Sequence, residues 1–167
     1  MTEEPVVRPR VLHPEDGEAL WFLGSLVTVK AAAEDTGGRC SVVEFVNPAG
    51  FATPLHRHLR EDEMFLVLEG AASFRCDDVE LQAGPGDFVL LPVGLPHAFW
   101  VTSAGPLRTL QITVPGGFER FAGDVGRPAT ERRLPPAAPL DPAALGHAAA
   151  MHGLEILGPP PGGQPPA

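Results

Sequence analysis

The sequence predicts an all-β fold, a sandwich or barrel, that ends in short helices. Short runs rich in Val, Leu, Ile, Phe and Thr recur along residues 19–115, and turn signals separate them about every 8 to 12 residues. No helical period is seen before Gly117. Beyond it, FERFAGDV is long enough for a short helix, and the pair Asp141 and Pro142 is a good N-cap and first turn for a second helix ending near Gly153.

The predicted strands alternate with turns along the chain. An apolar, partly β-branched run at residues 19–30 is broken by the turn DTGG (35–38), and the strand CSVVEFV leads to the turn NPAG (47–50). Gly70 ends the strand EMFLVLE, which begins at Glu63. The later predicted strands are AASFRC, VEL, FVLLP, HAFWV and, at residues 106–115, PLRTLQITVP.

This pattern divides the chain into four predicted segments. Residues 1–18 hold three prolines and several charges without periodicity, which predicts an N-terminal arm. Residues 19–115 form the predicted β-barrel, and residues 116–157 form a C-terminal helical segment. The tail, residues 158–167, reads GPPPGGQPPA and is predicted to be disordered because it has little apolar area to bury. A length of 167 residues suits one domain.

Composition narrows the classes of partner. The formal net charge of −9 disfavours nucleic acid, since binding to a phosphate backbone requires clustered Lys and Arg, and Lys30 is the only lysine. Cys40 and Cys76 form neither a metal-binding CxxC pair nor a disulfide framework. The first residues lack the apolar core of a signal peptide, and no apolar run approaches the roughly 18 residues of a membrane span. A cytoplasmic location without membrane association is therefore expected.

Four residues stand out as a candidate metal site. His56 and His58 are two positions apart, so in an extended segment both side chains lie on the same face. Glu63 opens one strand-like run and His97 opens another, and their side chains can turn toward the same point. Three nitrogen ligands and one oxygen ligand suit a divalent transition metal ion: Fe, Mn, Co, Ni or Zn. No Cys lies nearby, which argues against a closed structural zinc site of the thiolate type.

The same residues resemble a known family. Residues 50–70, GFATPLHRHLREDEMFLVLEG, match the first motif of the cupin superfamily at every defining position, and residues 86–97, GDFVLLPVGLPH, match most of the second. The Asn that usually closes the second motif is replaced by Val101, which puts in doubt the role of that Asn but leaves the four ligands intact.

The resemblance implies a cupin jelly-roll β-barrel in which His56, His58, Glu63 and His97 bind one metal ion. It also implies a homodimer. The apolar strand around Trp21 and Phe22 would support this if its side chains have to be buried by a second copy of the chain. Within the superfamily, the single motif pair followed by GGFERF is similar to the small bacterial cupins related to quercetin (flavonol) dioxygenase.

Strand parity predicts the substrate pocket. Phe65 and Val67 share a face with Glu63, whereas Phe99 and Val101 share a face with His97. None of these four carries a charge, so an apolar pocket is predicted, suited to a planar aromatic or enolic molecule rather than a sugar phosphate. The four side chains also suit plain core packing. Arg108 would either bring a cation to the barrel mouth or lie solvated at a strand end.

The predicted function is a metal-dependent dioxygenase that acts on an aromatic or enolic small molecule. Glu63 is the candidate catalytic residue, a metal ligand that releases to accept a substrate proton, and burial in an apolar barrel is expected to raise its pKa. Two alternatives stay open. One is a non-redox metal-dependent isomerase, cyclase or decarboxylase in specialised metabolism, and the other is a ligand-binding cupin without turnover.

Overall fold

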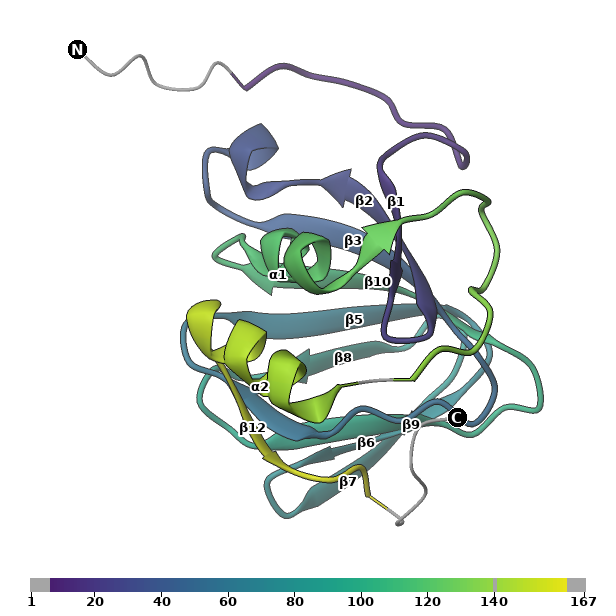
Figure 1. Ribbon diagram of the computed structural model, residues 1–167, viewed down its shortest axis with the longest axis vertical. Helices are drawn as coiled ribbons and strands as arrows, with labels where there is room; N and C mark the ends of the chain where they lie inside the picture. The colour runs from purple at the N-terminus through teal and green to yellow at the C-terminus, as the bar shows by residue number, and fades with distance from the viewer. Residues whose placement is uncertain (1–6, 140, 162–167) are drawn as a thin grey trace.

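Two antiparallel β-sheets packed face to face make up most of the computed structural model, which describes residues 7–139 and 141–161 (Figure 1). The larger sheet has the strand order β11 (Arg127–Pro128), β1 (Ala19–Phe22), β2 (Ser25–Ala31), β3 (Ser41–Asn47), β10 (Leu107–Val114), β5 (Asp62–Glu69) and β8 (Phe88–Leu91). The smaller has the order β12 (Leu154–Gly158), β4 (Leu55–His58), β9 (His97–Val101), β6 (Ala72–Cys76) and β7 (Val79–Ala83). The predicted all-β jelly-roll barrel is confirmed.

Alternating side chains place the core between the sheets. Along β3, β5 and β10, every second residue is buried and its neighbours are partly exposed, as expected for strands with one face in the core. Two apolar clusters fill this space. The first joins the β1–β3 end of the larger sheet to the C-terminal helices, and the second lies toward β6, β7 and β8.

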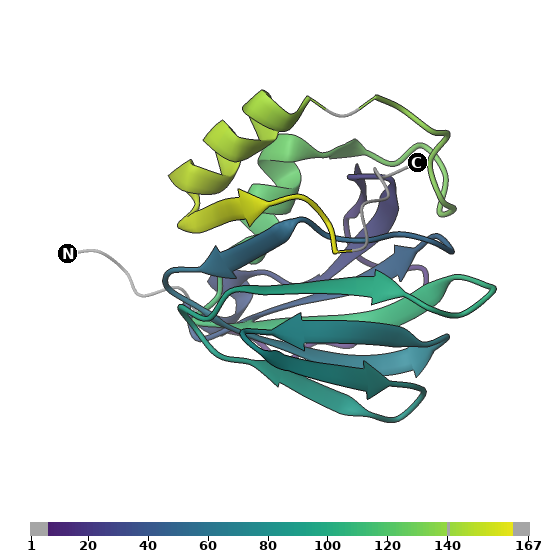
Figure 2. The same cartoon turned by 90° about the horizontal axis from the view of Figure 1, so that it is seen from below.

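Within the described residues, three short helices accompany the sheets: η1 (Ala33–Thr36), α1 (Phe118–Val125) and α2 (Pro142–Met151). The Asp141 carboxylate caps α2 by accepting hydrogen bonds from the backbone N–H groups of Ala143 (3.0 Å) and Ala144 (3.2 Å), which confirms the predicted cap. Figure 2 shows α1 and α2 together on one side of the sheets, next to β12 (yellow), the edge strand of the smaller sheet. The short 3-10 helix η1 overlaps the predicted turn at residues 35–38 and contradicts the expectation that no helix precedes Gly117.

The C-terminal segment also contains strands that the sequence did not predict. Gly153 follows α2 with φ of 74°, a left-handed conformation that favours glycine and lets the chain turn back. The chain then forms β12, which pairs with β4 so that Leu154 lies opposite His58 and Ile156 opposite His56. A two-residue strand, β11, pairs with β1. Residues 116–157 are therefore only partly helical.

The ends of the chain lie partly outside the described residues. The predicted arm includes residues 1–6 and the predicted disordered tail includes residues 162–167, so those parts stay predictions, as do the segment boundaries. Within the described part of the arm, Arg10 donates to Asp35 at 2.8 Å. No helix in the described ranges is both long and apolar enough to cross a membrane.

Trp21 and Phe22 do not form an uncovered surface. Phe22 is buried, with edge-to-face contacts to Phe45, Phe118 and Phe121. The guanidinium of Arg127 lies 4.9 Å from the centre of the Trp21 ring, whose Nε1 donates to the backbone oxygen of Arg133 at 2.8 Å. The expectation that this strand needs a partner molecule is wrong, because the chain's own C-terminal segment covers it.

Candidate metal centre

Three strands from both sheets bring the four predicted ligands together. β4 carries His56 and His58, β9 carries His97, and His56 lies directly opposite His97 in the register of these strands. Glu63 comes from β5 in the facing sheet. One nitrogen from each imidazole and one carboxylate oxygen all lie within 4.8 Å of one another. The sequence-predicted cluster therefore exists in the fold.

Hydrogen bonds fix the orientation of each imidazole ring. Nδ1 of His56 lies 2.8 Å from the backbone oxygen of Pro54, and Nδ1 of His97 lies 3.0 Å from that of Leu95. Since a carbonyl oxygen only accepts, each of these Nδ1 atoms carries the proton. Nδ1 of His58 lies 2.7 Å from the carboxylate of Glu61, which also accepts. In the neutral rings, Nε2 is thus left with a free lone pair in all three histidines.

The free nitrogen atoms are buried, which makes the cluster a suitable metal site. Nε2 of His58 and Nε2 of His97 are inaccessible to solvent and have no hydrogen-bond partner among the described residues. Leaving buried polar atoms without partners costs about 1 to 3 kcal/mol each. A bound cation would satisfy both atoms and balance the Glu63 carboxylate. Imidazole nitrogens whose other ring nitrogen is held by an acceptor are the usual metal-binding arrangement.

The Glu63 carboxylate is buried between the histidines and a glutamine. Its Oε2 lies 3.0 Å from Nε2 of His97, while its Oε1 lies 3.6 Å from Nε2 of His58 and accepts a hydrogen bond of 2.5 Å from Nε2 of Gln111. Burial by itself raises the pKa of Glu63, but the charge of His58, the contact with His97 and the charge of His56 outweigh it and lower the pKa to about 2. The expected raised pKa is therefore wrong.

The histidines differ in their own protonation. Burial is the main cause that lowers the pKa of His56 to about 4, and the neighbouring His97 adds to it. Burial also lowers the pKa of His58, yet the charge of Glu63 and the contact with Glu61 outweigh burial and raise the pKa above its ordinary value. At neutral pH the metal-free cluster thus combines an ionised Glu63 with a neutral His56.

An apolar cavity adjoins the cluster. Its wall includes His56, Glu63 and Gln111 beside a larger set of aromatic and aliphatic side chains from the sheets, α1, α2 and β12: Phe22, Leu23, Phe45, Phe51, Phe65, Phe99, Phe118, Phe121, Leu145, Leu154 and Ile156. Two of the four predicted pocket residues, Phe65 and Phe99, line this cavity. Val67 and Val101 do not. They pack in the second apolar cluster, farther along the same strand faces.

The cavity adjoins a wider surface groove. Leu23, Phe51 and Leu145 line both the cavity and this groove, which lies under residues 134–139. A small molecule that enters from the groove would pass these three side chains before it reaches His56. The apolar wall and the few polar groups near one end are typical of pockets for small organic molecules.

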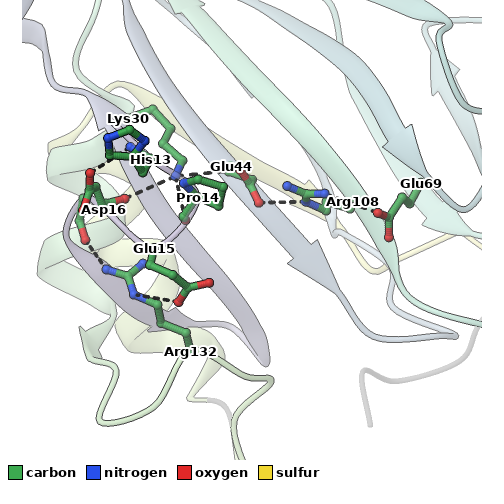
Figure 3. A network of polar contacts seen from close by, with 10 residues as sticks. His13, Pro14, Glu15, Asp16, Lys30, Glu44, Glu69, Arg108 and Arg132 are labelled. Carbon is green, nitrogen blue, oxygen red and sulfur yellow. Dashed lines mark hydrogen bonds and ion pairs between the residues drawn. The ribbon is translucent and has the colours of Figure 1, made fainter. Parts of the chain in front are cut away.

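Arg108 lies on the outer face of the larger sheet, away from this cavity. It donates to Glu44 at 2.8 Å and to Glu69 at 3.3 Å, and Glu44 in turn lies 3.9 Å from Lys30 (Figure 3). The inner face of β10 instead carries Leu107, Thr109, Gln111 and Thr113, all buried. Arg108 therefore brings no cation to the barrel mouth.

Three polar residues of the site were not predicted. Glu61 orients His58, Gln111 contacts Glu63, and Asn47 lines the cavity while donating to Ser25 Oγ at 2.8 Å. The alternation of side chains along a strand could have identified Gln111, since a polar residue recurs at every second position from Thr109 to Thr113. For Glu61, which lies between β4 and β5, the sequence gives no such periodicity.

The chain is thus a two-sheet β-barrel in which three histidines and one glutamate form a candidate metal site between the sheets. Residues 42–113 match the family model described as a cupin domain. Together with the fold, this match shows that residues 42–113 form a cupin domain.

One curated relative covers most of this chain. Quercetin 2,3-dioxygenase of Bacillus subtilis (strain 168) is 30% identical over 149 residues, which is 89% of this chain but 43% of that enzyme. The chain thus spans less than half the length of this relative. Acireductone dioxygenase of Rhodopseudomonas palustris (strain TIE-1) is 37% identical over 60 residues, which is 34% of this chain and 36% of that enzyme.

Solved structures agree on the fold. A predicted oxalate decarboxylase from Thermotoga maritima superposes with a TM-score of 0.59 at 17% sequence identity, covering 64% of this chain and 99% of that one. At this level of identity, the likeness concerns the fold alone.

Proposed function

We propose that this protein is a metal-dependent dioxygenase whose substrate is an aromatic or enolic small molecule. The observation that carries the proposal is the convergence of three Nε2 lone pairs and the Glu63 carboxylate on one point beside an apolar cavity. The similarity to a quercetin dioxygenase, which extends over most of this chain, supports the same reaction class.

His56, His58, Glu63 and His97 would hold one divalent transition metal ion. Such an ion supplies a Lewis acid for an enol or phenol oxygen and, if it is redox-active, a route for electron transfer to dioxygen. The cavity wall would hold the flat rings of the substrate and exclude water from the reacting carbon atoms. The substrate, dioxygen and the metal are all needed for the proposed reaction.

Glu63 would accept the proton of the substrate hydroxyl. Because its pKa is lowered to about 2, the carboxylate is ionised at neutral pH and ready to accept. The same low pKa makes it a weak base, so proton transfer would need a hydroxyl acidified by the bound ion. Glu63 would therefore act mainly as a ligand and only during turnover as a base.

An oxygen-electrode assay with the metal-loaded protein and a flavonol panel that includes quercetin tests this proposal. Oxygen uptake matched to flavonol loss, absent from the variant His56→Ala, His97→Ala, is the expected result. Metal-loaded protein that consumes no oxygen with any enol would contradict it.

The two alternatives give different results in the same experiments. A non-redox isomerase, cyclase or decarboxylase would turn over without oxygen and keep its activity with zinc. A ligand-binding cupin would retain its ligand and release no product. The fold hosts all three classes of function, so the reaction must be measured.

We also propose a homodimer formed through the outer face of strands β3, β10, β5 and β8. In the strand register, Val42, Ile112, Met64 and Leu90 form one apolar row, and Leu110, Leu66 and Phe88 form part of the next. The exposed fractions of Phe88 and Leu90 are 57% and 52%. Outward apolar rows on a sheet are typical of a covered surface.

The charged residues beside these rows suit a second copy of the same chain. Lys30 and Arg108 alternate with Glu44 and Glu69 along one side of the face and pair with them within the chain, so this side has balanced charge and would not repel a second copy (Figure 3). Sedimentation analysis should return a dimer that Leu90→Glu converts to a monomer. A monomeric parent protein at micromolar concentration would overturn the proposal.

A further inference from the structure

Gln111 is a buried glutamine beside the candidate metal centre. It lies in the middle of β10, opposite Phe65 of β5, with an exposed fraction of 2%. Glu63 is two residues before Phe65 on the same face of β5, so Gln111 and Glu63 are diagonal neighbours across the strand pair. Side chains of this length can reach each other diagonally.

The Gln111 amide fixes one of the two oxygen atoms of Glu63. Nε2 of Gln111 donates to Oε1 at 2.5 Å, whereas Oε2 lies 3.0 Å from Nε2 of His97. In the neutral His97 ring the proton is on Nδ1, which faces the backbone oxygen of Leu95, so Nε2 has no hydrogen to donate. Among the described residues, the Gln111 N–H is the hydrogen-bond donor to Oε1 and in this way restricts the rotation of the carboxylate.

This orientation matters because a carboxylate can bind a metal ion through one oxygen or both. A free Glu63 side chain would lose rotational entropy when an ion binds, whereas one already held by a buried hydrogen bond loses less. Both partners are buried, and a buried hydrogen bond to a charged group is stronger than one between neutral groups. The Gln111 contact is thus strong enough to select one carboxylate rotamer.

We propose that Gln111 is a positioning residue for the metal site: its amide N–H orients the Glu63 carboxylate for binding beside the three histidine nitrogens. This inference rests on the metal site of the proposed function. It concerns the chain's own residues and is read out by metal affinity, so it is tested without any substrate. Gln111 touches Glu63 rather than the reacting atoms and is therefore not assigned a catalytic role.

The test is Co²⁺ binding by the metal-free full chain, measured by titration calorimetry and by the visible absorption of the bound ion. Gln111→Met keeps the length of the side chain but removes the donor. Gln111→Asn keeps a polar amide but shortens its reach, so it carries the test if the Met variant does not fold. Thr109→Val is the matched control, since Thr109 is on the same face of β10, is equally buried and has a hydroxyl without a partner.

We expect both Gln111 variants to bind Co²⁺ about 10 to 100 times more weakly than the parent, as is typical when a partner of a metal ligand is lost. Their Co²⁺ absorption spectrum should also change, which a merely structural defect in β10 would not cause. Thr109→Val should match the parent in both measurements.

The outcomes separate the two proposals. A parent protein that binds no Co²⁺ would overturn the metal site and the proposed function with it. A parent that binds one Co²⁺ while Gln111→Met and Gln111→Asn bind it equally well, with unchanged spectra, would overturn the role of Gln111 alone. In the background Glu63→Gln, adding Gln111→Met should weaken binding no further, because the amide acts through that carboxylate.

Discussion

The two ends of the space between the sheets are built differently. Toward β6, β7 and β8, side chains such as Phe74, Leu91 and Leu107 fill the interior and are fully buried. Toward α1 and α2, an apolar cavity remains, and the His and Glu cluster lies at its edge. Phe65 and Phe99 belong to both regions. The filled end supplies rigidity, and the open end leaves room for an ion and a small molecule.

The largest expected effect is at the open end. Replacing His56 and His97 by Ala removes two of the three nitrogen ligands and should abolish stoichiometric metal binding. Metal analysis of the purified variant measures this directly. Because the substitution of His97 also removes a buried nitrogen atom that has no partner, part of the packing energy lost in the metal-free form should be offset. A variant that kept one ion per chain would contradict the ligand assignment.

A matched pair of Phe to Ala substitutions compares the two ends in stability. Phe74→Ala should lower the free energy of unfolding by about 3 to 5 kcal/mol, because the side chain is fully buried in the filled end. Phe51→Ala, at the cavity mouth where it meets the second apolar cluster, should cost only about 1 kcal/mol, because Phe51 is partly exposed already. Denaturant unfolding gives both values. Equal losses would show that the two ends are packed alike.

Metal affinity should rise with pH, and His58 should set the pH range. A proton and a metal ion compete for Nε2 of His58, whose pKa is raised above its ordinary value, whereas His56 and Glu63 lose their protons at about pH 4 and 2. Affinity should therefore increase as pH rises through the raised pKa of His58 and then level off. Calorimetry with Co²⁺ between pH 5 and 9 checks this, and a plateau already reached at pH 5 would contradict it.

The metal-free protein should show the opposite trend at His58. A raised pKa in the folded state stabilises that state at pH below the pKa of the unfolded chain, and the contribution is lost as pH rises through the folded-state pKa. Its free energy of unfolding should thus fall as metal affinity rises. Stability of the metal-free form that increases over the same pH range would contradict this sign for His58.

The smallest expected effect concerns helix α2, which packs over the cavity at the open end. Asp141→Ala removes both cap hydrogen bonds of α2 and should cost about 1 kcal/mol, with the metal affinity unchanged. Thermal unfolding and Co²⁺ titration measure the two quantities. A large loss of metal affinity would mean that α2 supports the ligands themselves rather than the cavity wall alone.

The four clustered residues were predictable from the sequence because their spacing combines with the two-residue period of a strand. His56 and His58 share a face of β4, and burial at Glu63, Phe65 and Val67 follows the expected alternation of β5. The residues that line the cavity were predicted only in part, since two of the four predicted pocket residues line it. Parity identifies the face on which Val67 and Val101 lie but not how far along the strand the cavity extends.

Other features depended on tertiary contacts that a pattern cannot show. Leu110, Ile112 and Val114 of β10 are apolar, yet they face outward, so the hydropathy of this part of the strand alone did not indicate that Gln111 faces inward. Strand β12 is five residues long, and its strand conformation depends on its pairing with β4. The low pKa of Glu63 arises from three histidines that the fold brings together, an effect that burial alone would reverse.

Crystallography of the metal-loaded protein with anomalous scattering at the metal absorption edge tests the central claim most directly. The account predicts one peak per chain, roughly 2.0 to 2.2 Å from Nε2 of His56, His58 and His97 and from an oxygen of Glu63. A peak located elsewhere, or a metal-loaded protein with no peak between β4, β5 and β9, would contradict it.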